Sequence, residues 1–473
     1  MNHAKNLLLI TFDQCRGDWI DPQKTRVELP YITRIAKSGI YFSKCYTTSP
    51  QCVPARLSWL TGLYPSQFNI TQNAAVNIPH DAPSMIRKMR DKGWHTAIVG
   101  KTHWTSHQEI GYDLRNNIDL LSRLGFEDAV EIAGPRAMQI IKCEIRDDWE
   151  KAGVLEEHLN DLKLRYQNGR TEKAWEVRPS KLPQELYPDI WITNKAVEKI
   201  DAMPTHKPWI LWVSFVGPHE PFDTPLPWHN KNKDIKLPKA LNRHNWIKKL
   251  NADCEMRKVA ESWSGKLTVD AIKNLRIDYA DHLQLLDDQV NRLVRAANKR
   301  EDNNRTSVAI TADHGEMLGD YSMLYKSTFL EPSIKVPMIY LENITNQNSH
   351  GKEVKRSVSL TNILKDILTI CAKKNASGNL LKYTNKAKHI CIEFREEMLV
   401  ISGGLKLCVN KTGEFLWCSK QEVQSEDVNI LNESNNLIEK IKLAKVKHIA
   451  RKELRKRAKE NWIWRDLSTK NTM

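Results

Sequence analysis

Long apolar runs are missing from this 473-residue sequence. A helix that spans a bilayer needs about 20 apolar residues, and no stretch of the chain reaches that length. The run from Asn6 to Phe12 ends at the acidic Asp13, which makes it too short for the core of a secretory signal peptide with its cleavage site. These absences lead us to expect a cytoplasmic protein without a membrane partner.

Cysteine pairs at the C-x-x-C spacing of zinc and redox sites are also absent. The nine cysteines are scattered and odd in number, which argues against a disulfide framework and against a structural zinc site. Most of them fit small buried apolar residues in a reducing compartment. Cys52 is the exception, for reasons that lie in its neighbours.

Acidic residues are outnumbered by basic ones, 57 against 72, and the formal net charge is +15. Ten of the basic residues lie between Lys440 and Lys459, where Glu453 is the one acid. Such a stretch can bind nucleic acid or acidic lipid, or it can be a solvated helix packed on the main domain. No aromatic residue interleaves with these charges, and the chain has no zinc-finger spacing or RNA-binding motif. We therefore expect the packed helix, with neither nucleic acid nor membrane as a partner.

Short apolar runs that end abruptly in polar residues predict the fold. Near-continuous runs of this kind are typical of parallel strands buried on both faces, and helical patterns separate them, as from Ile277 to Leu293. The runs and the polar groups after them are Leu7–Phe12 before Asp13, Thr96–Val99 before Gly100 to His103, Trp209–Val216 before Gly217 to His219, and Ser307–Thr311 before Asp313 to Gly315. We predict an α/β fold with a mainly parallel central sheet flanked by helices, whose ligands bind beyond the carboxyl ends of the strands.

Changes in the pattern of apolar, polar and glycine residues along the sequence predict three regions. Residues 1–380 carry the alternation of strands and helices and form the main α/β domain, with a variable polar insertion at 141–200 near the substrate entrance. Residues 381–435 contain short runs separated by glycines, typical of a small antiparallel sheet. Residues 436–473 predict a basic helical tail. The apolar positions expected on the packed face of that tail are Leu454, Ala458 and Trp462.

The segment around Cys52 has the features of a reactive site. Pro54 suits the first turn of a helix, which places Cys52 at the helix N-terminus, where the helix dipole favours an anion. Arg56 follows one turn later and faces the same side. Composition alone favours a buried structural cysteine, but the spacing of the proline and the arginine favours a reactive one.

Groups that bind metals follow the first and last of the predicted strands. Asp13 and Gln14 follow the first, and Asp313 and His314 follow the last. Carboxylate and amide oxygens suit a hard cation such as Ca²⁺ or Mg²⁺, and the imidazole nitrogen leaves Mn²⁺ open. Asp13 can also be a simple turn acid, and Asp313 the N-cap of a helix. The joint placement of both pairs at strand ends favours a metal site.

Cationic and proton-donating groups lie at similar places. These residues are Lys101, His103, His219 and Lys326. Taken singly, each lysine is more often a solvated charge and each histidine a structural residue. Two tryptophans near them, Trp104 and Trp228, can stack on a sugar ring, although core packing explains them equally well.

The stretch Cys52-x-Pro54-x-Arg56, continuing to Thr61-Gly62, resembles the signature of the type I sulfatases, the formylglycine-dependent family of the alkaline-phosphatase-like superfamily. The resemblance covers most of the chain and predicts an alkaline-phosphatase-like fold. The other blocks that carry it, in the family order, are Asp13-Gln14, Gly100 to Trp104, Trp212 to Phe222, Asp287 to Val290, Thr311 to Asp320, Lys326, and Val336 to Ile339.

The resemblance implies that a maturation enzyme oxidises Cys52 to formylglycine, and that the sequence belongs to a sulfuric ester hydrolase. One hydroxyl of the aldehyde hydrate attacks the sulfur of a small-molecule or saccharide sulfate ester, and the second then expels sulfate. The metal ligands implied are Asp13, Gln14, Asp313 and His314, completed by the modified Cys52. Among divalent cations we expect Ca²⁺, with Mn²⁺ or Mg²⁺ as alternatives.

The resemblance also implies roles for the remaining polar residues. Lys101 and Arg56 steady the hydrate, while His219 and Lys326 hold the sulfate and assist the leaving group. Lys101 contacts the substrate as well. His103 helps to restore the aldehyde, and Asn73 is a further candidate for a sulfate contact.

One departure from the family keeps a rival open. Many sulfatases have two acids where this chain has Asp13-Gln14, and a glutamine there also resembles the choline-sulfatase and phosphonate-monoester-hydrolase branches. A phosphonate monoester or phosphodiester hydrolase with the same machinery is therefore the first alternative. The second is a non-catalytic binding protein on this fold.

Overall fold

The computed structural model describes residues 5–469, apart from 75, 77, 80, 106–109, 171–173, 243–244, 347–350, 373–379, 384–388 and 422–436, and it describes side chains up to residue 458. Its largest element is an eight-stranded sheet in the order β10-β2-β9-β7-β1-β6-β4-β5. The strands are β1 (Asn6–Phe12), β2 (Ile40–Phe42), β4 (His95–Lys101), β5 (Asp128–Ile132), β6 (Trp209–Ser214), β7 (Thr306–Ala312), β9 (Met338–Leu341) and β10 (Lys352–Val354).

Five neighbouring strands of this sheet, β7-β1-β6-β4-β5, run parallel. The strand β9 is antiparallel to both β7 and β2, so the sheet is mixed but mainly parallel. All seven residues of β1 are buried, as expected for a strand covered on both faces. The predicted fold class is confirmed, and the carboxyl ends of β7, β1, β6 and β4 meet at one edge.

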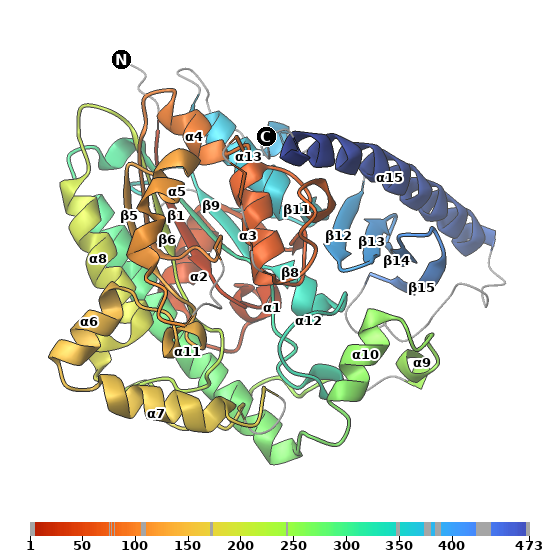
Figure 1. Ribbon diagram of the computed structural model, residues 1–473, viewed down its shortest axis with the longest axis horizontal. Helices are drawn as coiled ribbons and strands as arrows, with labels where there is room; N and C mark the ends of the chain where they lie inside the picture. The colour runs from red at the N-terminus through yellow and green to blue at the C-terminus, as the bar shows by residue number, and fades with distance from the viewer. Residues whose placement is uncertain are drawn as a thin grey trace.

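Helices cover both faces of the sheet (Figure 1). On one side lie α8 and α11, which pack against each other, and on the other lie α3, α4 and α13. The helices are α1 (Gly17–Ile20), α2 (Pro30–Ser38), α3 (Cys52–Thr61), α4 (Met85–Arg90), α5 (Ile118–Leu124), α6 (Glu144–Lys151), α7 (Leu155–Tyr166), α8 (Pro188–Ala202), α9 (Asn245–Lys248), α10 (Glu255–Ser262), α11 (Val269–Asn298), α12 (Glu331–Ile334), α13 (Leu360–Cys371) and α14 (Leu380–Tyr383). None in the described chain has the length and apolar content of a membrane span.

Asp287 links two of these helices. It lies in α11, and its carboxylate accepts hydrogen bonds from the backbone N–H groups of Tyr31 at 3.1 Å and Ile32 at 2.7 Å. These donors belong to the first turn of α2, where they have no partner within the helix. The acid therefore caps α2 from a neighbouring helix and fixes the position of α2 beside α11.

Two smaller sheets complete the fold. One has three short strands, β3 (Cys45–Tyr46), β8 (Lys335–Val336) and β11 (Val358–Ser359). The other is the predicted antiparallel sheet, formed by β12 (Ile390–Phe394), β13 (Glu397–Ser402), β14 (Leu405–Asn410) and β15 (Phe415–Lys420). The helix α15 (Leu437–Thr469) lies across this second sheet (Figure 1).

Alternate residues of β13 pack into two different hydrophobic cores. Leu399 and Ile401 pack into the main core, whereas Met398 and Val400 pack against α15. This alternation is the period-two pattern of a strand, and it makes the small sheet a layer between the main domain and the helix.

The packed face of α15 differs from the expected one. Val446 and Ala450 are buried against the sheet, Leu454 is half-buried and Ala458 is exposed. The side chain of Trp462 lies outside the described residues. The expectation for Ala458 was wrong because Arg457, not its neighbour, turns inward to meet an acidic partner.

The predicted boundary between residues 380 and 381 falls at the start of α14. The predicted boundary between residues 435 and 436 lies outside the described residues. The division into three regions stays a prediction.

Candidate active site

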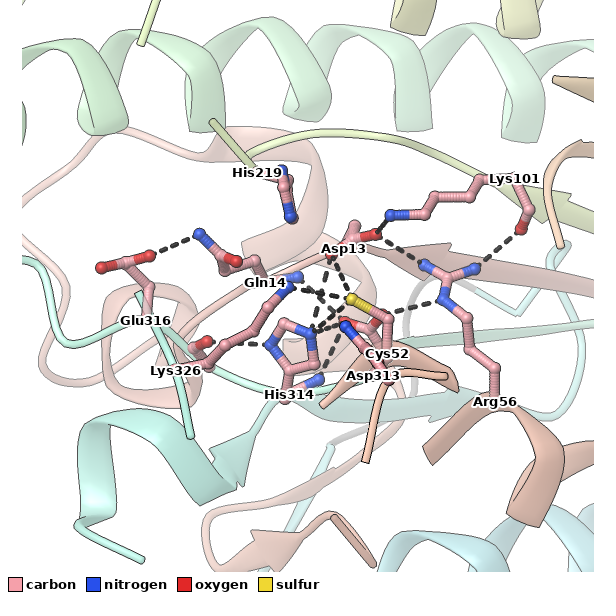
Figure 2. A network of polar contacts seen from close by, with 12 residues as sticks. Asp13, Gln14, Cys52, Arg56, Lys101, His219, Asp313, His314, Glu316 and Lys326 are labelled. Atoms are coloured by element: carbon pink, nitrogen blue, oxygen red, sulfur yellow. Dashed lines mark hydrogen bonds and ion pairs between the residues drawn. The ribbon is translucent and has the colours of Figure 1, made fainter. Parts of the chain in front are cut away.

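The predicted site residues converge at the carboxyl edge of the central sheet (Figure 2). Asp13 follows β1, Lys101 ends β4, His219 follows β6 and Asp313 follows β7. Since these four strands are neighbours in the sheet, residues up to 300 positions apart in sequence come together. The N-terminus of α3 brings Cys52 to the same place.

Cys52 is fully buried at the start of α3, as predicted, with Pro54 in the first turn. Its sulfur lies 2.9 Å from Lys326 Nζ, 3.1 Å from His314 Nε2 and 3.9 Å from Asp13 Oδ1. Burial by itself raises the pKa of the Cys52 thiol, but the positive charges of Lys326 and Lys101, with a further contribution from His314, outweigh it and hold that pKa well below its ordinary value. The position therefore stabilises a negatively charged side chain.

Arg56 ties the two strand-end acids together. Its Nε donates to Asp313 Oδ2 at 2.8 Å and its Nη2 donates to Asp13 Oδ2 at 3.2 Å. Its Nη1 donates to the backbone oxygen of Lys101 at 2.7 Å and to Ser214 Oγ at 2.9 Å. The guanidinium thus binds groups at the ends of all four strands, and it occupies one oxygen of each carboxylate while the other oxygen faces inward.

The inward oxygens form a pocket of ligand atoms. Asp13 Oδ1 and Asp313 Oδ1 lie 3.8 Å and 3.6 Å from His314 Nε2. With the Cys52 sulfur, these four buried side chains place one ligand atom each within 4.8 Å of one another. His314 Nδ1 lies 3.0 Å from the backbone oxygen of Gly315, so Nδ1 carries the proton and Nε2 presents its lone pair. Charged Lys101 and Arg56 hold the pKa of Asp13 low, although burial and Cys52 oppose them, so its carboxylate is ionised.

Gln14 supplies a further oxygen. Its Nε2 donates to Glu220 Oε2 at 3.1 Å and to the carboxylate of Glu316. Because both partners are acceptors, the amide orientation is determined, and Oε1 must face away from them. Among the described residues no donor reaches this buried Oε1. An unsatisfied buried oxygen beside two carboxylates and an imidazole fits a divalent cation, and so the residues present match the metal predicted from the sequence.

The alternative interpretation of Asp313 as a helix N-cap is wrong. No helix starts at this residue, and its Oδ1 instead accepts hydrogen bonds from the backbone N–H groups of Gln14 and His314, both at 2.9 Å. These bonds fix the loops after β1 and β7 against each other.

The position of the Lys101 side chain depends on the close approach of β4 to β6. The glycine before it, Gly100, has φ of +112°, and a Cβ there would collide with the backbone oxygen of Ser214 in β6. The close approach directs Lys101 Nζ onto Asp13, with which it forms a buried ion pair.

Two histidines near the sulfur are kept neutral. Burial lowers the pKa of His103, although a hydrogen bond to Cys52 opposes the change. Burial also lowers the pKa of His219, although Glu220 opposes it. His219 Nδ1 lies 2.7 Å from the backbone oxygen of Glu220, so Nε2 is the atom left to meet a substrate.

A cavity of about 450 Å³ opens beside Cys52. This size is in the range of roughly 300–1,000 Å³ that holds small ligands. The predicted residues that line it are Cys52, Asn73, Lys101, His103, His219 and Lys326. Asn73 also has a structural task, since its Oδ1 accepts a hydrogen bond from the Val53 N–H at 3.0 Å at the start of α3.

The two tryptophans proposed for sugar stacking are core residues. Trp104 is buried, with its ring stacked on Phe126 and edge-on to Trp212. Trp228 is buried too, and its Nε1 donates to Asp288 at 3.3 Å.

Four functional residues were not identified from the sequence. Glu220 and Glu316, which orient Gln14, follow His219 and His314 closely, and that proximity was an unused signal. Arg136 and Arg170 line the cavity. Arg136 follows β5, a strand whose two acids interrupt the apolar pattern, and no sequence signal marks Arg170.

Comparisons with known proteins identify the family and the fold. The family model described as Sulfatase matches residues 5–371. The chain is 27% identical over 369 residues to an arylsulfatase of Clostridium perfringens, which spans 77% of this chain and 74% of that protein. It is 25% identical over 376 residues to the multifunctional alkaline phosphatase superfamily protein PehA of Trinickia caryophylli, across 75% and 71% of the two chains. The solved phosphonate monoester hydrolase SpPMH from Silicibacter pomeroyi superposes with a TM-score of 0.70 at 17% identity, over 96% of each chain, which confirms the alkaline-phosphatase-like fold.

Proposed function

This chain belongs to the sulfatase family of sulfuric ester hydrolases, and we propose that Cys52, matured to formylglycine, is the residue with which it cleaves a sulfate monoester. The observation that carries the proposal is the position of the Cys52 sulfur, 2.9 Å from Lys326 and 3.1 Å from His314 in a buried cluster with Asp13 and Asp313. A structural cysteine has no need of such surroundings, because burying these charges costs free energy.

The metal in our proposal is held by Asp13, Gln14, Asp313 and His314, together with the modified Cys52. Three of the protein side chains offer oxygen and one offers nitrogen, which fits a hard cation, and the number of protein ligands favours Ca²⁺ over Mg²⁺, which usually keeps several waters. When both groups are present, the cation stabilises negative charge on the sulfate and the formylglycine hydrate supplies two hydroxyls, one to attack sulfur and one to release sulfate.

The chain's own cations stabilise the charge that develops on the sulfate oxygens. Lys326 Nζ projects to the sulfur of Cys52, and His219 lines the same cavity. We assign these two residues to the sulfate and to the departing alcohol, which needs a proton or a positive neighbour. Lys326 is a cation fixed in a buried site, so it does not have to reorganise during the reaction, whereas His219 donates from Nε2 only when it is protonated.

Arg56 and Lys101 act on the other side of the reacting group. They bind Asp13, and Arg56 also binds Asp313, so they hold the carboxylates in place and balance their charge. His103 is kept neutral by burial and hydrogen-bonds to Cys52, which suits it to accept a proton when the aldehyde is restored.

The maturation step is tested by the mass of the peptide that contains Cys52. The protein is produced with and without a formylglycine-generating enzyme, and we expect the aldehyde, or its hydrate, only after co-expression. Turnover of 4-nitrophenyl sulfate should rise in proportion to the modified fraction. Full turnover by a preparation in which Cys52 is entirely unmodified would overturn the proposal.

Gln14 supports one alternative function, hydrolysis of a phosphonate monoester or phosphodiester by the same residues. An amide in place of a second acid lowers the negative charge of the site by one, and a phosphonate monoester or a phosphodiester carries the same single negative charge as a sulfate monoester, so the site can accept either kind of group. Parallel kinetics on 4-nitrophenyl sulfate and on a nitrophenyl phosphonate monoester separate the two. A larger kcat/KM for the phosphonate would favour the alternative, and turnover of neither would favour a binding protein.

We also propose a cytoplasmic location. All nine cysteines are free and buried in the structure, which fits a compartment that keeps thiols reduced. Fractionation of cells that express the full chain, with a periplasmic and a cytoplasmic marker enzyme, tests this.

A further inference from the structure

The cavity beside Cys52 carries more positive charge than one sulfate group needs. Four basic side chains line it: Lys101, Arg136, Arg170 and Lys326. Lys101 pairs with Asp13, Lys326 lies 2.9 Å from the Cys52 sulfur, and Arg170 pairs with Glu220. Lys101 and Arg170 therefore each have an acidic partner, and Lys326 faces the residue that reacts.

Arg136 differs from the other three. Its side chain is exposed and lines the cavity, and no acidic group among the described residues forms an ion pair with it. Its charge acts on Glu220 without an ion pair, so its guanidinium offers a planar set of donors that matches a carboxylate or a sulfate.

The loop that carries Arg136 lies close to the catalytic lysine. A Cβ on Gly134 would lie 3.0 Å from Lys101 Nζ, and Gln139 and Ile140 of the same loop also line the cavity. The wall formed by residues 134–140 is therefore continuous with the floor of the site. A substrate whose sulfate lies at Cys52 therefore has this wall beside it.

Arg170 extends the positive surface and is rigidly held. Its guanidinium carbon lies 4.1 Å above the ring of Tyr325, and it pairs with the buried Glu220. Its Nε is buried and meets no acceptor among the described residues, although the charge of Glu220 keeps the pKa of Arg170 high against its burial. A fixed guanidinium on the cavity wall is preorganised for a ligand anion.

We propose that the substrate carries a second anionic group, a carboxylate or a second sulfate, and that Arg136 binds this group while the ester sulfate lies at Cys52. Arg170 contributes to the same subsite. The cavity of about 450 Å³ holds a ring-sized molecule with two such groups, and the proposal rests on the proposed function.

Three substrates test the subsite: 4-nitrophenyl sulfate, an analogue with a carboxylate on the ring, and an analogue with a second sulfate. In the Arg136→Gln protein we expect kcat/KM for at least one doubly charged substrate to fall about tenfold or more beyond any fall for the monosulfate, because a charge-assisted bidentate pair is lost. The ratio of variant to wild type cancels the different intrinsic reactivities of the three esters. The analogue with the larger loss identifies the second group.

Arg455→Gln is the matched control. This arginine is exposed on α15 and does not line the cavity, and its substitution should leave all three kcat/KM values unchanged. An equal loss for the three substrates in Arg136→Gln would overturn the proposal, because it would mean that Arg136 acts on the sulfate or on the fold.

A binding measurement separates this proposal from the proposed function. Calorimetry with the disulfate and with the carboxylated sulfate is performed on Cys52→Ala protein, with and without Arg136→Gln. We expect the second substitution to weaken binding of one of them about tenfold or more. If no ester is hydrolysed and this loss is still seen, the subsite stands while the hydrolase assignment falls. Equal binding of both ligands by both proteins would overturn the subsite.

Discussion

Two buried networks of ion pairs in this molecule contain similar residues but differ in function. At the edge of the central sheet, Arg56 binds Asp13 and Asp313. Between the C-terminal sheet and α15, Arg457 binds Glu393 and Glu453, and its guanidinium lies 4.3 Å from the ring centre of Tyr64. Each network is an arginine between two acids.

Each network contains a buried polar atom that no described partner reaches, Gln14 Oε1 in the first and Arg457 Nε in the second, and the networks differ in what lies beside them. Next to Arg56 lie the buried Gln14 Oε1, which no described donor reaches, and a cavity of about 450 Å³. Next to Arg457, Glu393 also accepts hydrogen bonds from the Ser66 N–H at 2.6 Å and from Ser66 Oγ at 3.1 Å, while His389 meets Glu453 at 3.2 Å. The first network is open toward a ligand, and the second joins β12, η1 (Pro65–Gln67) and α15. We infer that the first serves catalysis and the second stability.

The largest effect should come from Cys52→Ala at the open network. Removal of the residue that becomes the nucleophile should lower kcat/KM for 4-nitrophenyl sulfate by at least about 10,000-fold, with little change in Tm. Cys418→Ala, a buried cysteine of the C-terminal sheet, is the control and should keep kcat/KM per folded molecule. Comparable losses in the two proteins would erase the distinction between the networks.

Arg457→Ala removes the cation at the centre of the second network. Because it leaves the buried Glu393 without its cation, it should lower the free energy of unfolding by about 3–5 kcal/mol. Urea denaturation measures the loss, and kcat/KM per folded molecule should not change. Arg455→Ala, on the exposed side of the same helix, should be neutral to within about 0.5 kcal/mol. A catalytic defect in the Arg457→Ala protein would show that the networks are coupled.

Gln14→Glu changes the open network without removing volume. A carboxylate at this position meets Glu220 and Glu316, which accept from the amide in the native protein. Repulsion should displace the ligand oxygen and lower both divalent-cation affinity and kcat/KM by about 10–100-fold. Cation titration and kinetics measure the two losses, and Gln167→Glu at an exposed position is the control. Tighter cation binding in the Gln14→Glu protein would contradict our account of the orienting acids.

The smallest effect is a pH dependence in the second network. Hydrogen bonds with Cys391 and Glu453 raise the pKa of His389 to about 9, above its ordinary value of 6.5. The protonated histidine therefore stabilises the fold fully below pH 6.5, and this contribution is lost as the pH rises through 9. For this half-buried pair we expect a difference of the order of 1 kcal/mol between wild type and His389→Asn, seen at acidic pH and absent at alkaline pH in urea denaturation. A constant difference across that range would rule out His389 as the titrating group.

The open network could be predicted from the sequence because its residues are tied to strand ends. Asp13, Lys101, His219 and Asp313 each follow a recognisable apolar run, and parallel strands bring such positions together whatever their distance in the chain. The resemblance to sulfatases added Cys52 and Lys326, which come from a helix start and a loop. Local pattern and family signature were enough for this part.

The second network and the cavity wall could not be predicted in the same way. The face of α15 that packs depends on where Glu393 lies, and no local pattern reports the position of an acid about 60 residues away. Arg136 follows β5, which contains the acids Asp128 and Glu131. This strand therefore lacks the continuous apolar run of the other parallel strands. Both features depend on tertiary contacts that the sequence does not display.

The two-sided packing of β13 has a consequence for synthesis of the protein. The sheet β12–β15 leaves the ribosome before α15, so Met398 and Val400 remain uncovered until the helix arrives. During that interval the nascent chain presents a bare apolar sheet face to its surroundings, a surface on which chaperones act and chains associate. Fast formation and docking of α15 should therefore shorten this exposure and raise the yield of native enzyme.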